Sequence, residues 1–188
     1  GSVTKIAINT ALIAATMLLV PLTAMLITDE MNWSFFDFAA AWILLFGAGF
    51  TYRLIARMMS NIKYRAAVGL AVATALFLVW SNLAVGLIGS EDNPANLMYM
   101  GVLAIGFLGS IIAKLKPKGM SLVLFSMAFS HIIITVIAMI VRVELLPESS
   151  VIEILAVNGF FAILWSGSAL LFRNGAQEQT PVDSLQQN

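Results

Sequence analysis

Six apolar stretches of about twenty residues follow one another along the chain, and short polar segments separate them. Their expected bounds are residues 6–28, 38–59, 66–89, 97–115, 120–142 and 150–172. A helix of about twenty apolar residues spans a hydrocarbon core of about 30 Å. The pattern therefore predicts six membrane-spanning segments.

Each stretch is expected to be an α-helix, because backbone polar groups in lipid must find their partners within the segment. Strands of membrane β-barrels are about ten residues long and alternate polar with apolar positions, and these stretches do neither. Short connections favour antiparallel hairpins. The predicted fold is an all-α integral membrane protein, a compact bundle of six transmembrane helices in one domain, residues 1–173. The polar tail, residues 174–188, is predicted to be disordered and cytoplasmic.

Charged residues alternate between the two sets of helix ends. Nine of the ten Lys and Arg residues lie at one set of ends: Lys5, Arg53, Arg57, Lys63, Arg65, Lys114, Lys116, Lys118 and Arg173. Eight of the ten acidic residues lie at the other set, with Arg142 as the basic exception: Asp29, Glu30, Asp37, Glu91, Asp92, Glu144, Glu148 and Glu153. Lys and Arg are enriched in cytoplasmic loops, so both termini are predicted to be cytoplasmic. The expected location is a bacterial inner (plasma) membrane.

Composition removes several classes of function. The chain is 60% hydrophobic and 11% charged, which leaves too little charge to solvate a globular surface. It has no cysteine and no net charge, so thiolate chemistry, Cys-bound metal and a basic nucleic-acid surface are excluded. The expected surroundings are the lipid bilayer and other membrane helices.

His131 is the chain's single histidine and lies near the middle of the fifth stretch. An ionisable side chain at mid-bilayer is costly and suggests a functional site. Thr135 follows one turn later on the same helical face. A proton or ion path is one interpretation, and a neutral histidine that bonds a neighbouring helix is the other.

Polar residues in three other spans pose the same choice between a path and packing. Asn82 and Asn158 are intramembrane amides in the third and sixth spans, and with His131 they could line a shared cavity. Asn9, Thr16 and Thr23 recur every seven residues in the first span, which places them on one helical face. Pro21 should interrupt that helix, because it has no N–H to donate. A path for a small solute or ion through these residues is one expectation, and ordinary helix packing is the other.

Enzymatic chemistry is not favoured. The sequence has no HExxH motif and no pair of intramembrane carboxylates, and Ser130 and His131 are adjacent, so they point about 100° apart on a helix. No cofactor is predicted. Haem bound through His131 would need a methionine as its second axial ligand, and none of the ten methionines is specifically placed for it.

Two surface features suggest partners. Arg53, Arg57, Lys63 and Arg65 surround one turn and could bind a lipid headgroup or phosphate, although basic residues also simply mark cytoplasmic loops. Small residues such as Gly106 and Ser110 permit close helix contact, either within the chain, with a second copy or with another membrane protein.

Asn93-Pro94-Ala95 is the short motif that aquaporins carry twice in buried half-helices. Here it occurs once, in a turn beside Glu91 and Asp92, so we interpret it as a helix start in which Asn93 caps and Pro94 takes the first position. The sequence thus favours a small membrane protein that transports or binds a solute or ion. The alternative is a non-catalytic subunit or assembly partner of a larger membrane complex.

Overall fold

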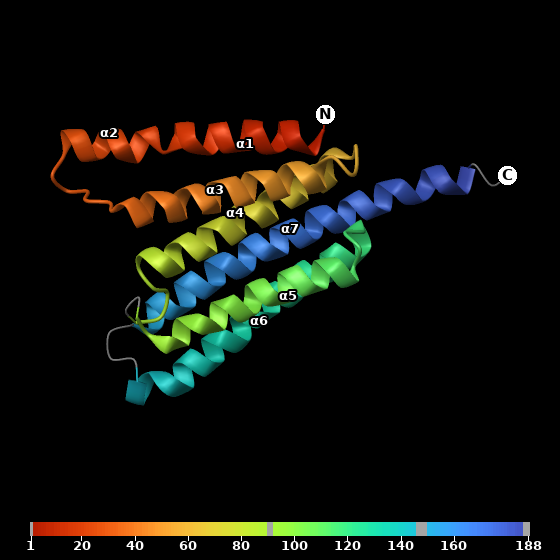
Figure 1. Cartoon of the computed structure of the whole chain (residues 1–188). Coiled ribbons are helices and arrows are strands. Elements are labelled where there is room, and N and C mark those ends of the chain that lie inside the picture. The colour runs from red at the N-terminus through yellow and green to blue at the C-terminus, as the bar shows by residue number, and fades with distance from the viewer. Residues whose placement is uncertain (1, 90–91, 146–149, 186–188) are drawn as a thin grey trace. The chain divides into compact units, whose positions relative to one another are not determined.

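The computed structural model describes the backbone of residues 2–89, 92–145 and 150–185, and the side chains of residues 2–89, 92–141 and 150–178 (Figure 1). These residues form helices and no strand. Six helical segments are long and apolar enough to cross a membrane, as the hydrophobic pattern predicted. Glu91 and Glu148, together with the side chains of Arg142 and Glu144, belong to the charge pattern but lie outside the described part.

The chain divides into two compact units, Gly1–Met58 and Met59–Asn188. The first is a helical hairpin, and the second contains the other four spans. A single six-helix domain stays a prediction.

The first unit pairs α1 (Val3–Met17) and α2 (Leu19–Ile27) with α3 (Phe35–Ala56). α1 and α2 together form the first span, and the break between them falls at Leu18, three residues before Pro21, where a proline removes one helical hydrogen bond. Thr10 and Ala14 of α1 are buried. The indole of Trp42 on α3 donates to the carbonyl of Ala11 at 3.2 Å.

The second unit contains α4 (Ile62–Ala84), the short 3₁₀ helix η1 (Pro94–Leu97), α5 (Met98–Ile112), α6 (Pro117–Leu145) and α7 (Val151–Leu185). α7 lies between α4 and α6, and α5 packs on α6 (Figure 1). Buried residues recur every three or four positions along α7 and lie on one face of it: Ile154, Asn158, Phe161, Trp165, Ser168 and Phe172. That spacing follows the 3.6-residue period of a helix, so one stripe of α7 forms the core of this unit.

Side chains define where several helices begin. Ser34 and Asp37 form a capping box at α3, and Ser150 and Glu153 exchange the same two hydrogen bonds at α7. Such reciprocal bonds satisfy backbone donors that a helix start leaves unpaired. Asn93 caps η1 with Pro94 at its start, so the local interpretation of Asn-Pro-Ala is confirmed.

The third span lies about four residues earlier than predicted, at Ile62–Ala84 instead of 66–89. Asn61 accepts from the backbone N–H groups of Lys63 and Tyr64 and so starts α4 there. After Ala84 the chain turns, and Gly86 and Gly89 have φ angles of 74° and 66°, a conformation that suits glycine. Lys63 and Arg65, which were expected in a loop, are therefore in the first turn of α4.

The last helix also differs from expectation, because α7 continues to Leu185, whereas composition predicted disorder from residue 174. The contacts of Glu178 provide the physical reason. Its carboxylate forms an ion pair with Lys63 and accepts from the Asn61 carboxamide at 3.0 Å. Gly175 packs beside the Tyr64 backbone, and these contacts hold the first part of the tail against the start of α4.

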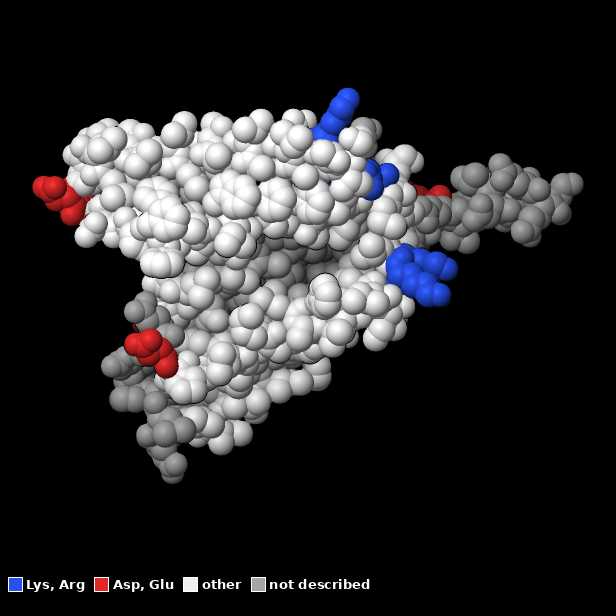
Figure 2. Space-filling model, viewed as in Figure 1, with Lys and Arg blue, Asp and Glu red and all other residues white. Residues whose placement is uncertain are grey.

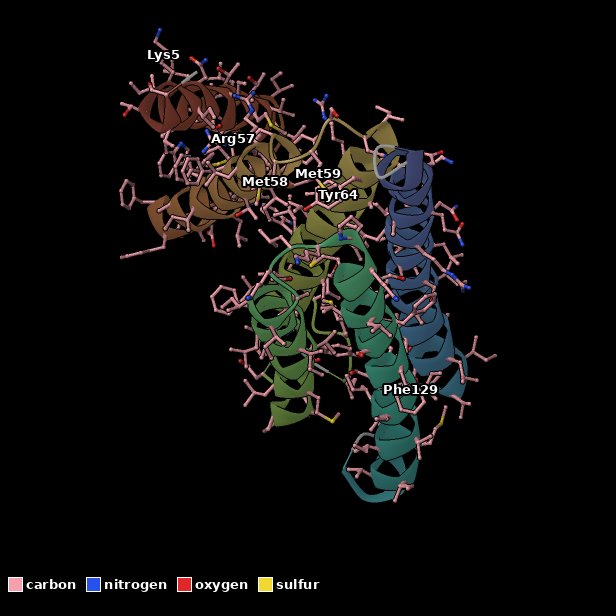
Figure 3. All side chains as sticks on the ribbon, turned by 90° about the vertical axis from the view of Figure 1, so that its right-hand side faces the viewer. Lys5, Arg57, Met58, Met59, Tyr64 and Phe129 are labelled. Atoms are coloured by element: carbon pink, nitrogen blue, oxygen red, sulfur yellow. The ribbon has the colours of Figure 1, made fainter. Side chains whose placement is uncertain are left out.

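Tyr64 links three elements of the second unit. Its hydroxyl donates to the carbonyl of Leu115 at 2.9 Å, in the α5–α6 turn, and its ring meets Phe172 of α7 edge to face. Figure 3 labels it near the start of α4. Lys114 and Leu115 in that turn have φ angles of 51° and 57°, a conformation that costs non-glycine residues energy, and the Tyr64 bond supports it.

Small residues on α5 have different surroundings. A Cβ added at Gly109 would lie 2.8 Å from both γ-carbons of Val123 on α6, and one at Gly106 would meet the flexible end of Met127. A Cβ at Gly101 would meet nothing within 4 Å. The close contact at Gly106 and Gly109 is therefore internal.

We predict that Gly109→Ala lowers the free energy of unfolding by about 1–3 kcal/mol, because stiff Val123 cannot move aside without cost. Gly101→Ala is the matched control on the same helix and should be neutral or stabilising by up to about 1 kcal/mol. Unfolding in mixed detergent micelles measures both. Equal effects of the two variants would contradict the tight α5–α6 contact.

Candidate functional site

His131 lies at the centre of a closed hydrogen-bond network in the second unit. Its side chain on α6 is fully buried. The indole N–H of Trp165 donates to its Nε2 atom at 3.1 Å, and its Nδ1 atom lies 3.0 Å from Oδ1 of Asn158. An indole nitrogen can only donate, so Nε2 accepts and the proton is on Nδ1. The network therefore fits a neutral imidazole in one tautomer.

Asn158 on α7 continues this network to a third helix. Its Oδ1 atom also accepts from the hydroxyl of Tyr99 on α5 at 3.2 Å. Its Nδ2 atom donates to the carbonyl of Ile154, one turn earlier, at 3.0 Å. The hydrogen-bonded chain of Tyr99, Asn158, His131 and Trp165 joins α5, α6 and α7, and we call it the His131 network.

Aromatic rings enclose the imidazole. Phe161 stacks on it with ring centroids 5.6 Å apart and an interplanar angle of 13°, and Tyr99 lies at the same distance, tilted by 36°. All four members of the network and Phe161 are buried. Apolar walls strengthen hydrogen bonds within them and penalise any that are broken.

This geometry limits the chemistry of His131. Both ring nitrogens are engaged, so neither has a free lone pair for iron or for an incoming proton. Haem ligation would require Trp165 to leave Nε2, and so would protonation of that atom. The arrangement thus resembles the expected neutral histidine that joins neighbouring helices.

Thr135 lies one turn beyond His131 and is half-buried. Its hydroxyl donates to the His131 backbone carbonyl at 2.7 Å. Bonds of this kind satisfy a hydroxyl within its own helix. Thr135 is therefore next to the His131 network, but its hydroxyl is used by α6 itself.

Asn82 belongs to a different polar group. Its Nδ2 atom donates to the Asn96 backbone carbonyl at 3.2 Å, while its Oδ1 atom is buried with no hydrogen-bond partner among the described residues. Asn96 is buried and accepts from the N–H groups of Leu87 and Ile88, both at 2.9 Å. It also donates to the carbonyl of Ile88, so it holds the turn after α4 against η1.

The stripe of the first span lies in the other unit. Asn9, Thr16 and Thr23 are all exposed there. The hydroxyls of Thr16 and Thr23 donate to carbonyls four residues earlier, at 2.8 and 2.6 Å. The structure thus groups His131, Asn158 and Thr135 and leaves Asn82 in a separate polar group of the same unit.

The expected headgroup residues are divided between the units. Arg53 and Arg57 end α3, whereas Lys63 and Arg65 begin α4. Lys63 is paired with Glu178, an acid of the same chain. In Figure 2 a blue patch lies where α5 ends and α6 begins. Lys114 and Lys116 are in the turn between these helices, and Lys118 is in the first turn of α6.

Sequence reasoning missed Tyr99, Trp165, Asn96 and Glu178. A signal existed for Trp165, because it lies seven residues after Asn158 and so shares its face. Asn96 follows Asn93-Pro94 at a helix start, where a polar side chain is usually expected to face solvent. Tyr99 and Glu178 act across helices, and spacing along one helix does not reveal such contacts.

Comparison with protein-family models, with curated proteins and with solved structures gives no match for this chain. Function is therefore inferred from the residues and contacts above.

We predict that His131→Ala lowers the free energy of unfolding by about 1–3 kcal/mol, because it leaves the Trp165 N–H buried without an acceptor. Ser130→Ala is the matched control, since that neighbouring hydroxyl donates to the Ser126 carbonyl of its own helix and bonds no other helix among the described residues. Detergent unfolding followed by Trp fluorescence measures both. A His131→Ala variant as stable as Ser130→Ala would show that the network contributes little.

Proposed function

We propose that this chain is a non-catalytic membrane protein that serves as a subunit or assembly partner of a larger membrane complex. The observation that carries the proposal is the His131 network. Of the residues expected to serve a solute path, His131 and Asn158 are instead bonded to one another, and Thr135, Thr16 and Thr23 are bonded to their own helices. A solute path needs polar groups that remain available to the solute. In a subunit or assembly partner, the same groups serve only to hold the helices in a fixed arrangement.

The rest of the second unit supports the same proposal. Ser168 donates to the Ala67 carbonyl at 2.8 Å between α7 and α4, and Tyr64 supports the α5–α6 turn. Polar side chains in this unit therefore fix how helices meet. Surfaces of such a unit can present a constant shape to another membrane protein.

Transport of a small solute or ion is the second candidate, and Asn82 favours it. Its buried Oδ1 atom, near the end of α4, has no hydrogen-bond partner in the part of the chain that the structure describes. An unpaired buried acceptor costs about 1–3 kcal/mol, and a solute or ion that bound there would recover this cost.

To separate the two, we would purify the chain from its own membrane in a mild detergent and record native masses. We expect a second polypeptide at fixed stoichiometry, because a subunit should retain its partner under mild extraction. The matched assay reconstitutes the chain alone and measures solute flux by vesicle swelling. Flux by the isolated chain that falls in Asn82→Leu, with folding intact, would favour transport and contradict the assembly role.

We also propose that both termini are cytoplasmic and that the membrane is a bacterial inner membrane. Support comes from the nine basic residues at one set of helix ends and their known cytoplasmic bias. In the second unit the α5–α6 lysines lie at the opposite end of the helices from Asp92. Lys5 points away from α1 at the start of the first unit (Figure 3).

The absence of cysteine makes this topology directly testable. Asn32 and Ser60 are exposed residues in the turns before and after α3. We expect Asn32→Cys to react with a membrane-impermeant maleimide in intact spheroplasts, and Ser60→Cys to react only after permeabilisation. The reverse pattern would overturn the orientation, and labelling of both would overturn the span between them.

A further inference from the structure

The second unit brings basic residues from three separate segments together at one end. Tyr64 is the contact between the segments: its hydroxyl donates to the Leu115 carbonyl at 2.9 Å, and its ring meets Phe172 with centroids 5.3 Å apart. Each of these three residues lies within three positions of basic residues in the chain. We call those basic residues the Tyr64 basic surface: Arg65, Lys114, Lys116, Lys118 and Arg173.

The side chains of the Tyr64 basic surface are all exposed. They form no ion pair with an acid in the part of the chain whose side chains the structure describes, whereas the nearby Lys63 is paired with Glu178. Beyond that part, the sequence has one further acid in the tail, Asp183. Positive charge at this end of the second unit therefore exceeds negative charge.

The chain does not attach an acidic end of the first unit here. α3 ends at Ala56 and α4 begins at Ile62, so the short link joins α4 to the basic end of the hairpin, which has Lys5 and Arg57. The acids of the first unit are at its other end: Asp29, Glu30 and Asp37. Because α3 has 22 residues, it separates the two ends by about 33 Å. An anionic partner from outside the protein therefore matches this surface in charge.

Exposed apolar side chains directly adjoin the basic ones. Ile112, 82% exposed, precedes Lys114 by two residues, and Leu122, 68% exposed, follows Lys118 by one turn of α6. Both belong to helices long and apolar enough to cross a membrane. A phospholipid has the same order of groups, with acyl chains in the hydrocarbon and a phosphate at its edge, whereas free phosphate has no apolar part.

We propose that the Tyr64 basic surface binds the phosphate group of an anionic membrane phospholipid, whose acyl chains lie along Ile112 and Leu122. Clusters of Lys and Arg at the ends of transmembrane helices are the usual sites of such headgroups. The Tyr64 hydroxyl also supports the turn at Lys114 and Leu115, where both φ angles are positive, so the lysines are presented from a fixed turn. This inference does not depend on the proposed function.

Basic residues at helix ends also determine topology without binding a ligand. That role requires charge on the correct side of the membrane, so basic residues at either unit's end serve it equally. Binding of a headgroup requires charge at the positions around Tyr64. Variants that lose the same number of charges from different units therefore separate the two roles.

Native mass spectrometry of the chain in a mild detergent tests the proposal, with phosphatidylglycerol and phosphatidylcholine of identical acyl chains as probes. We expect phosphatidylglycerol to bind more tightly. Lys116→Gln combined with Lys118→Gln should weaken its binding about fivefold or more, since one basic residue near an anionic surface contributes about 1 kcal/mol. Lys5→Gln combined with Arg57→Gln is the matched control, because it removes two exposed charges from the first unit, and it should leave the affinity unchanged.

Lys116→Arg combined with Lys118→Arg keeps both charges and should retain binding, and detergent unfolding checks that each double variant is folded. Equal affinity for the two lipids would overturn the proposal. So would an equal loss of affinity in the two Gln variants, because net charge alone would then explain the binding. Displacement of the lipid by millimolar inorganic phosphate would show that the surface takes free phosphate and would overturn the lipid assignment.

Discussion

A polar side chain inside the hydrocarbon has no water to bond, so its partners must come from the protein itself. In the second unit this constraint determines what meets at the core. The imidazole of His131 accepts from the Trp165 indole on one nitrogen and donates to the Asn158 oxygen from the other. The same Asn158 oxygen also accepts from the Tyr99 hydroxyl. Apolar side chains of similar size can slide past one another, whereas these bonds form in one register of α5, α6 and α7. His131, whose burial in an apolar helix costs free energy, thus belongs to the hydrogen-bonded chain that aligns α5, α6 and α7.

The positions of charged residues at the helix ends can be compared with those that the helix dipole favours. The dipole favours acids at helix starts, and Asp37 and Glu153 are in capping boxes at the starts of α3 and α7. Lys5 and Lys63, however, are in the first turns of α1 and α4, where no acid is present. Those positions oppose the dipole, and for Lys63 the ion pair with Glu178 offsets this cost. The proposed orientation therefore rests on the basic residues and their usual cytoplasmic bias, because the acidic residues at helix starts already have a local role.

The sequence allowed the six helices to be predicted because length and apolarity are local properties, and the described structure confirms six such helices. Helix ends were less accurate, because they depend on single side chains: Asn61 moved the start of α4, and Glu178 extended the packed part of α7. For the site, burial of His131 and Asn158 could be expected from their polarity and depth. Their partners Tyr99 and Trp165 could not, because α5, α6 and α7 must first be placed side by side before a donor on one can be matched to an acceptor on another.

The asparagines of the spans show how this protein distributes its hydrogen-bonding capacity. Asn158 is bonded through both polar atoms, and Asn96 holds a turn. Among the described residues, one acceptor of Asn82 has no partner, and the exposed side chain of Asn9 has no hydrogen bond. Mutational cost alone cannot rank these roles, since removing a paired asparagine destabilises the fold while removing an unpaired one can stabilise it. An unpaired carboxamide in an apolar helix therefore points to an interaction more directly than a buried, satisfied histidine does. Among the described residues, the free capacity is on α1 and at the end of α4, whereas both ring nitrogens of His131 are engaged.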